Sequence, residues 1–177
     1  EIVNKKMKNQ KGFSLIELLI VVVIIGIIAA IAIPNLLAAR RSANEGSAVS
    51  AMRTLHGAEM TFASTSGAGN FSNAAALATQ NLIDGVLAAA IGDDGAYPTA
   101  QKSGYVYSLG TTDFTGGTPA SFGFATRPIS ETGVTRTGSR RFGIQTDGVL
   151  YFDNGAALSL NVDAAGVLTG TSQVLNN

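Results

Sequence analysis

The chain has 177 residues, a length that suits one domain with an appendage, and its formal net charge is zero. The absence of cysteine excludes thiol catalysis, cysteine-bound zinc and iron–sulfur clusters, although it is compatible with a secreted domain. The charges are unevenly placed: four lysines lie within the first 12 residues, and the rest of the chain carries eight Lys/Arg against eleven Asp/Glu. After residue 12 the sequence has no basic stripe of the kind that binds nucleic acid.

Residues 13–33 form an apolar run in which only Ser14 and Glu17 are polar. As a helix, a run of this length spans roughly 31 Å, enough to cross the core of a bilayer. The lysines before it predict a cytoplasmic N-terminus, with the chain beyond Pro34 outside. A carboxylate inside such a helix costs about 2.5–3.5 kcal/mol on insertion scales, so we expect Glu17 to need a partner.

Two kinds of processing fit this run. A secretory signal would be cut after it, where the stretch IIAAIAIPN has small residues but no clean A-x-A signal. Cleavage between Gly12 and Phe13 would instead leave the helix on the mature protein, and Met7, the first methionine, would begin a very short basic leader. The residues alone leave both open.

Residues 11–34, KGFSLIELLIVVVIIGIIAAIAIP, closely resemble the N-terminal signature of type IV pilins and other prepilins. The similarity is to a type IVa-like major pilin, with pseudopilins as relatives. In that family a membrane peptidase cuts after the glycine and N-methylates the new terminus. The resemblance implies that residues 1–12 are a cleaved leader ending at Gly12 and that Phe13 is the methylated first residue. It matches Glu17 to the family's glutamate, and Gly26 and Pro34 to its helix-breaking pair.

The resemblance also implies a partner for Glu17. In a growing filament its carboxylate would pair with the amine of Phe13 in a neighbouring subunit, which recovers much of the cost of a buried charge. The alternative is a carboxylate that reaches the membrane interface from one end of the run. Between Gly26 and Pro34 the helix would unwind inside filaments, or else simply kink.

The remainder predicts an α+β fold. Residues 13–34 form the protruding, filament-core half of one long helix, and residues 35–66 form an amphipathic half with an apolar stripe at Ala51, Leu55, Ala58 and Phe62. Residues 67–104 form a connecting region with short helical pieces. Residues 103–177 form an antiparallel sheet of about four strands on which the helix packs.

The expected strands are SGYVYSL, ASFGFATRP, RRFGIQT and GVLYFD, which alternate aromatic or aliphatic with small or polar residues. The pairs Tyr105/Tyr107 and Phe122/Phe124 are spaced to share one sheet face each and predict core packing. Asp147-Gly148 signals a hairpin, and LSLNVDAAGVLTG allows a further one.

The other polar features favour structural roles. His56 is the only histidine and has no partner histidine or cysteine in the pattern. The run Asp93-Asp94-Gly95 lacks the ligand spacing of a calcium loop and predicts a polar turn. Asn70 begins an N-x-S glycosylation sequon, a weak pattern. We therefore expect no metal, no cofactor and no catalytic residue.

The predicted function is a non-enzymatic structural subunit of a type IV pilus, for adhesion, twitching motility or DNA uptake. Its expected partners are other copies of itself, the prepilin peptidase and methylase, the pilus assembly machinery and inner-membrane lipid. It would be a single-pass inner-membrane precursor and then part of an extracellular fibre. One alternative is a pseudopilin of a type II secretion system: the resemblance implies a Pro-Trp-Gly-type motif in many major pseudopilins, and this chain has no tryptophan. It also implies a C-terminal disulfide in many type IV pilins, and this chain has no cysteine, so the subtype stays open. The second alternative is a signal-anchored extracytoplasmic binding protein.

Overall fold

The computed structural model describes residues 12–154, 159–170 and 172–175. The chain divides into two compact units, Glu1–Ala38 and Ala39–Asn177. Of the predicted leader, residues 1–11 lie outside the described residues.

The first unit contains the start of helix α1, Leu15–Thr65, which is 51 residues long. From Phe13 to Leu36 the large apolar side chains are exposed, from 50% for Val21 to 87% for Phe13. Among the described residues this is the one helix long and apolar enough to cross a membrane, and no residue of its most apolar window is buried. The predicted long N-terminal helix is confirmed, and in this single chain it continues through Gly26 and Pro34.

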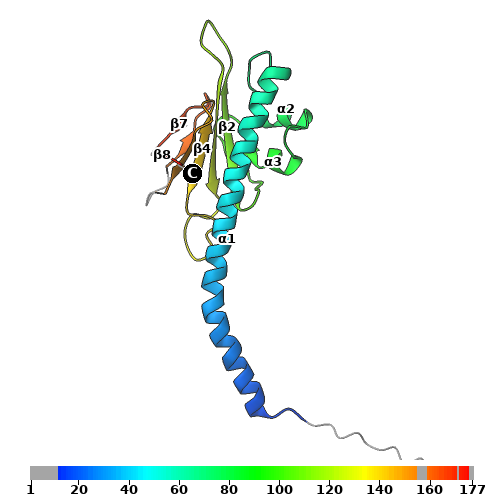
Figure 1. Cartoon of the computed structure of the whole chain (residues 1–177), viewed down its shortest axis with the longest axis vertical. Helices are drawn as coiled ribbons and strands as arrows, with labels where there is room; N and C mark the ends of the chain where they lie inside the picture. The colour runs from blue at the N-terminus through cyan, green and yellow to red at the C-terminus, as the bar shows by residue number, and fades with distance from the viewer. Residues whose placement is uncertain (1–11, 155–158, 171, 176–177) are drawn as a thin grey trace, which may run out of the picture. The chain divides into compact units, whose positions relative to one another are not determined.

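The second unit, which we call the head, begins at Ala39 and contains the rest of α1 packed along the sheet (Figure 1). The buried apolar side chains of this part recur at intervals of three and four residues, as one face of a helix requires. They are Ala48, Ala51, Met52, Leu55 and Ala58. Phe62, which we expected on the same stripe, is partly buried against the core.

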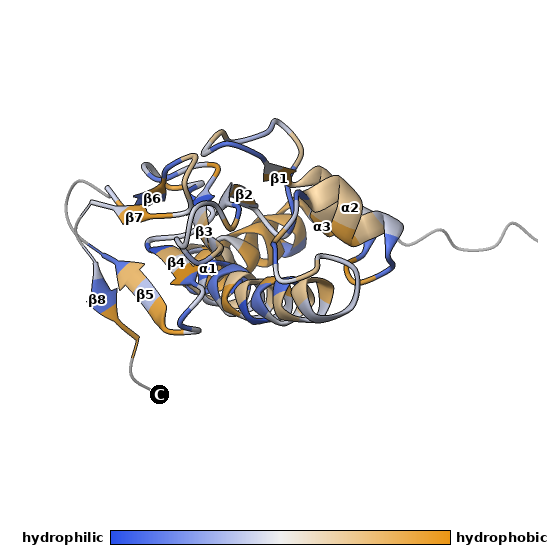
Figure 2. Ribbon diagram, turned by 90° about the horizontal axis from the view of Figure 1, so that it is seen from above, coloured by the Kyte–Doolittle hydropathy of each residue, from blue (hydrophilic) through white to orange (hydrophobic). Residues whose placement is uncertain are grey.

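Two short helices connect α1 to the sheet: α2, Ala74–Thr79, and α3, Gly85–Ala89. Asn73 caps α2 by accepting the Ala76 N–H at 2.9 Å, and Asp84 caps α3 by accepting the Leu87 N–H at 2.8 Å. These helices lie beside α1, near the β1 edge of the sheet (Figures 1 and 2). They correspond to the short helical pieces expected between residues 67 and 104.

The main sheet has six strands in the order β1-β2-β3-β4-β5-β8. They are β1 Ile91–Gly92, β2 Tyr105–Thr112, β3 Ser121–Pro128, β4 Arg141–Gln145, β5 Leu150–Asp153 and β8 Gln173–Val174. All neighbours are antiparallel except β1 and β2. The α+β class and the four central strands are therefore confirmed. The estimate of about four strands omits β1 and β8, because a two-residue strand shows no periodicity.

Both expected hairpins form. Asp147 and Gly148 lie in the connection between β4 and β5, where Gly148 has a φ of +73°, a left-handed conformation that glycine adopts at little cost. The connection holds four residues rather than the two that the Asp-Gly signal favours. The second hairpin, β6 Asn161–Val162 and β7 Leu168–Thr169, is a separate two-stranded sheet.

The alternation along β2, β3 and β4 separates two packed faces of the main sheet. The aromatic and aliphatic residues on one face join the core cluster that includes α1, among them Tyr107, Phe122 and Phe142. The other face carries one glycine from each of these strands, Gly110, Gly123 and Gly143. A β-carbon on Gly110 would meet the carbonyl oxygen of Asp163 in the β6–β7 connection. The small residues of the strands therefore make room for this second hairpin.

Replacing Gly110 by Ala should destabilise the head by about 2–3 kcal/mol, because backbone would have to move to admit the new methyl group. Gly57→Ala is a matched control: nothing lies within 4 Å of its added β-carbon, and a helix interior favours alanine over glycine by about 1 kcal/mol. Thermal unfolding followed by near-ultraviolet circular dichroism measures both. Equal melting temperatures for the two variants would contradict the packing of β6–β7 on this face.

Candidate assembly site

Glu17 lies in the first turn of α1 and has a hydrogen-bond partner within its own chain. The helix begins at Leu15, so Ser14 is the residue that precedes it. The backbone N–H of Ser14 donates to Glu17 Oε2 at 2.9 Å. A glutamate that reaches back three residues in this way is one half of a capping box, and a negative charge in a first helical turn also interacts favourably with the helix dipole.

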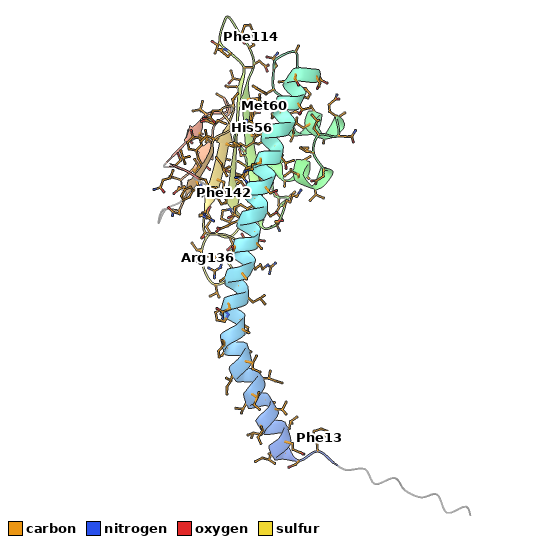
Figure 3. All side chains as sticks on the ribbon, viewed as in Figure 1. Phe13, His56, Met60, Phe114, Arg136 and Phe142 are labelled. Carbon is orange, nitrogen blue, oxygen red and sulfur yellow. The ribbon has the colours of Figure 1, made fainter. Side chains whose placement is uncertain are left out.

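This cap was missed from the sequence, although the spacing Ser14-Leu15-Ile16-Glu17 carries its signature, a serine followed three residues later by a glutamate. Because a long apolar run follows, the sequence favours an interpretation of Glu17 as a charge within the membrane and not as a cap. The consequence is that Glu17 is already oriented toward the start of the helix. The exposed Phe13 lies just before that start (Figure 3).

From this turn onward, one face of the helix has a shallow apolar groove of about 300 Å³. Its lining residues repeat at the spacing of one helical face, and they are Leu15, Leu18, Leu19, Val22 and Val23. A surface of this kind, next to a single carboxylate, suits contact with lipid or with another apolar helix.

The predicted helix-breaking pair lies further along α1. A β-carbon on Gly26 would meet nothing within 4 Å. Pro34 has no N–H, so the carbonyl of Ala30 loses its usual helical donor. One residue further, Asn35 Nδ2 donates to the carbonyl of Ile31 at 3.1 Å, which supplies a side-chain donor in the turn that the proline weakens. Unwinding between Gly26 and Pro34 concerns the filament and stays a prediction.

The remaining polar candidates make structural contacts in the head. His56 Nε2 lies 3.4 Å from the carbonyl oxygen of Thr146, and its ring centroid lies 5.5 Å from that of Phe122. Asn70 Oδ1 accepts the Phe114 N–H at 2.9 Å. Asp93 Oδ1 accepts the Ala74 N–H at 3.4 Å. Within the described ranges, no group of three or more His, Cys, Asp or Glu side chains is placed to hold a metal ion.

Two buried carboxylates on α1 were not singled out from the sequence. The first, Glu45, accepts the N–H and the hydroxyl of Ser139 at 2.8 and 2.7 Å, and the Nε and Nη2 of Arg140 at 2.9 and 2.8 Å. Burial raises the pKa of Glu45, but these hydrogen bonds and the guanidinium charge outweigh burial, so its pKa lies below the usual value. Glu45 therefore joins α1, as an ionised group, to the loop that precedes β4.

The second, Glu59, is fully buried; the Ser72 N–H donates to its Oε2 at 3.1 Å, and within the described part of the chain its Oε1 has no hydrogen-bond donor. Burial, with a smaller contribution from Asp93, raises the pKa of Glu59 to about 7. No sequence signal could have separated these two glutamates, because their partners lie in other segments.

Replacing Glu45 by Ala should lower the free energy of unfolding by about 2 kcal/mol, since α1 would lose the hydrogen bonds and the ion pair that its buried carboxylate forms with Ser139 and Arg140. Asp113→Ala, at an exposed carboxylate, should change it by no more than about 0.5 kcal/mol. Thermal unfolding of the two variants at neutral pH tests the difference, and comparable stabilities would argue against a structural role for the Glu45 contacts.

Comparisons with known proteins agree with the resemblance of the first segment. A family profile described as a prokaryotic N-terminal methylation motif matches residues 7–33. The chain is 69% identical over 39 residues to the type IV wide pilus major component PilA4 of Thermus thermophilus, which is 22% of this chain and 30% of that protein. The chain carries the N-terminal segment of the type IV pilin and pseudopilin family.

Two further relatives are a fimbrial protein and a secretion-system protein. A fimbrial protein of Pseudomonas aeruginosa is 79% identical over 29 residues, 16% of this chain and 19% of that protein. The type II secretion system core protein G of Vibrio cholerae is 44% identical over 54 residues, 30% of this chain and 37% of that protein. The matches thus span less than two fifths of each of these relatives. No solved structure matches the chain.

Proposed function

We propose that this chain is the structural subunit of a type IV pilus, polymerised through the first half of α1 into an extracellular fibre. The observation that carries the proposal is a helix whose large apolar side chains are all at least half exposed from Leu15 to Leu36, with one carboxylate in its first turn. Such a surface requires lipid before assembly and neighbouring helices after it. The names of the pilus component and the fimbrial protein among the relatives support the same function.

Processing would take place between Gly12 and Phe13, on the cytoplasmic side of the inner membrane, by a prepilin peptidase that also methylates the Phe13 amine. Gly12 is exposed, and a β-carbon there would meet no atom within 4 Å. An exposed glycine, which has no side chain, suits an enzyme that must approach the peptide bond closely.

Glu17 would then select assembled over dispersed subunits. A carboxylate offers about four acceptor sites on two oxygens, so Glu17 can keep the Ser14 N–H on Oε2 and still accept the amine of a neighbouring subunit. That amine is a cation at the same depth, and pairing would remove much of the cost of the charge in the apolar filament core. Gly26 and Pro34 would let the intervening helix unwind within the fibre.

The proposed partners are further copies of the chain, the peptidase, the assembly machinery and, before assembly, membrane lipid. The proposed location is the inner membrane, with the N-terminus cytoplasmic, followed by the cell surface. The role is structural, with neither a catalytic residue nor a cofactor.

A second candidate is a pseudopilin of a type II secretion system. The match of 54 residues to a secretion core protein G is longer than the 39-residue match to the Thermus pilus component, although its identity is lower. Expression in a strain that lacks its major pilin separates the candidates: a pilus subunit restores surface fibres, whereas a pseudopilin restores protein export in a strain that lacks protein G.

Replacing Glu17 by Ala should abolish fibres while the subunit accumulates in the membrane. The change removes an intramembrane charge and so favours insertion of the single subunit by about 2–3 kcal/mol, but it also removes the group proposed to bind the neighbouring amine. Electron microscopy of surface fibres at matched membrane levels of subunit is the measurement. Glu17→Asp, which keeps the charge with a shorter reach, should give an intermediate yield, and a wild-type yield from Glu17→Ala would reject the pairing role.

Replacing Gly12 by Leu should leave an uncleaved precursor in the membrane, because the added side chain would obstruct the peptidase at the cut. Mass spectrometry of the N-terminus distinguishes the precursor from a chain that begins at methylated Phe13. Gly26→Leu lies away from the cut and should be processed normally. A methylated Phe13 terminus in the Gly12→Leu variant would be evidence against the assigned cleavage position.

A further inference from the structure

Glu59 is the acidic member of a small set of buried polar atoms that lack a hydrogen-bond partner. Among the described residues these atoms are Glu59 Oε1 and the hydroxyl oxygens of Tyr107 and Ser108. Burial moves the pKa of Tyr107 further above its ordinary value, so that phenol stays neutral at physiological pH. Glu59 is the one of the three whose charge changes near neutral pH.

The groups nearest to Glu59 come from two connecting segments and from the preceding turn of α1 itself. Ser72, which precedes α2, donates its N–H to Oε2 at 3.1 Å. Asp93, which follows β1, adds a like charge that raises the pKa of Glu59, and its own Oδ1 accepts from Ala74. His56, one turn earlier on α1, contacts Thr146 in the β4–β5 connection. No basic side chain is among the groups that shift the pKa of Glu59.

A cavity of about 420 Å³ borders the same two neighbours. Ser72 and Asp93 line it, together with Phe71, Asn73, Asp94 and Asp113. The contact between α1 and the segment of residues 70–95 thus has two parts. Apolar side chains such as Leu77 and Leu87 pack in the core cluster with Leu55 of α1. Beside them lies a half-paired carboxylate whose neighbours Ser72 and Asp93 line an open, polar space. This segment includes α2 and α3, which lie beside α1 (Figures 1 and 2).

The ionised carboxylate is the costly form at this position. A charge without water, with one oxygen unpaired and a second carboxylate nearby, can be stabilised only by admitting water or by opening the contact. Glu45, on the same helix, differs from Glu59 in having enough donors. Four contacts from Ser139 and Arg140 keep the Glu45 carboxylate ionised although it is buried.

We propose that Glu59 is a proton-operated latch between α1 and residues 70–95, which we call the latch segment. When Glu59 is protonated, the latch segment stays docked on α1 through its apolar core side chains, and a neutral carboxyl oxygen still accepts the Ser72 N–H. When Glu59 ionises, water enters by way of the adjoining cavity and the latch segment opens locally while the sheet stays folded. The exposed surface of the head would thereby depend on pH, independently of how the subunits assemble.

The direction of the effect follows from proton linkage. The pKa of Glu59 is about 7 in the docked state and 4.5, its ordinary value, when the side chain reaches water. Docking is therefore fully favoured at low pH and is weakened as the pH rises through 7. Between pH 5.5 and 8.5 these two values give an increase of about thirtyfold in the open population of the latch segment.

Hydrogen–deuterium exchange with mass spectrometry on the full chain in detergent micelles tests the proposal. Protection factors, corrected for intrinsic exchange with an unstructured reference, should fall at least tenfold for peptides within residues 70–90 between pH 5.5 and 8.5. Peptides from β3, in the centre of the sheet, should keep theirs. Equal protection of the latch segment at both pH values would overturn the proposal.

Two variants connect the effect to this carboxylate. Glu59→Gln keeps the shape and stays neutral, so the latch segment should be protected equally at both pH values. If that variant fails to fold, Asp93→Asn still decides, because removing the neighbouring charge lowers the pKa of Glu59 and should move the transition to lower pH. A wild-type pH dependence in Glu59→Gln, or an unchanged midpoint in Asp93→Asn, would contradict the latch.

Discussion

An apolar helix surface that its own chain leaves exposed, with one carboxylate in its first turn, is the constraint on which the proposed function depends. From Phe13, just before α1, to Leu36 the large apolar side chains are between 50% and 87% exposed. Water is a poor environment for this surface, so the segment requires lipid or other helices. Both environments are apolar, and hydrophobicity alone therefore gives little preference for one over the other.

Glu17 supplies the difference between these environments. In the single chain its Oε2 holds the Ser14 N–H, which fixes the side chain at the start of the helix. In lipid the remaining charge is costly, whereas in a filament the amine of a neighbouring Phe13 would neutralise it. The same carboxylate thus caps its own helix and, in our proposal, sets the position of the next one.

The head presents the opposite problem, because there α1 must stay attached to a sheet. Apolar packing supplies most of the contact, through a stripe that contains Ala48, Met52 and Leu55. Two buried carboxylates make that attachment specific. Glu45 accepts from Ser139 and Arg140 and has a lowered pKa, whereas Glu59 is half paired and has a pKa raised to about 7. Only the contact made by Glu59 is proposed to respond to pH.

The sequence predicted most of the architecture because its strongest signals are local. The apolar run, the stripe at Ala51, Leu55 and Ala58, and the alternation of β2 to β5 all repeat within a few residues. The edge strands β1 and β8 are too short to show a period, and the role of Gly110 depends on a hairpin some 50 residues further along the chain. The burial of Glu45 depends on Ser139, 94 residues away, a separation that no local pattern reports.

The most direct test of the central claim is a distance between subunits in the assembled fibre. Solid-state NMR on fibres mixed from ¹⁵N-phenylalanine subunits and ¹³C-glutamate subunits would measure it, because the terminal amine of Phe13 resonates apart from the amides. Our account predicts dipolar dephasing between that amine and a glutamate carboxyl carbon of another subunit, at about 4 Å or less, as in a salt bridge. Fibres in which the amine shows no dephasing from the carboxyl carbons of other subunits would contradict it.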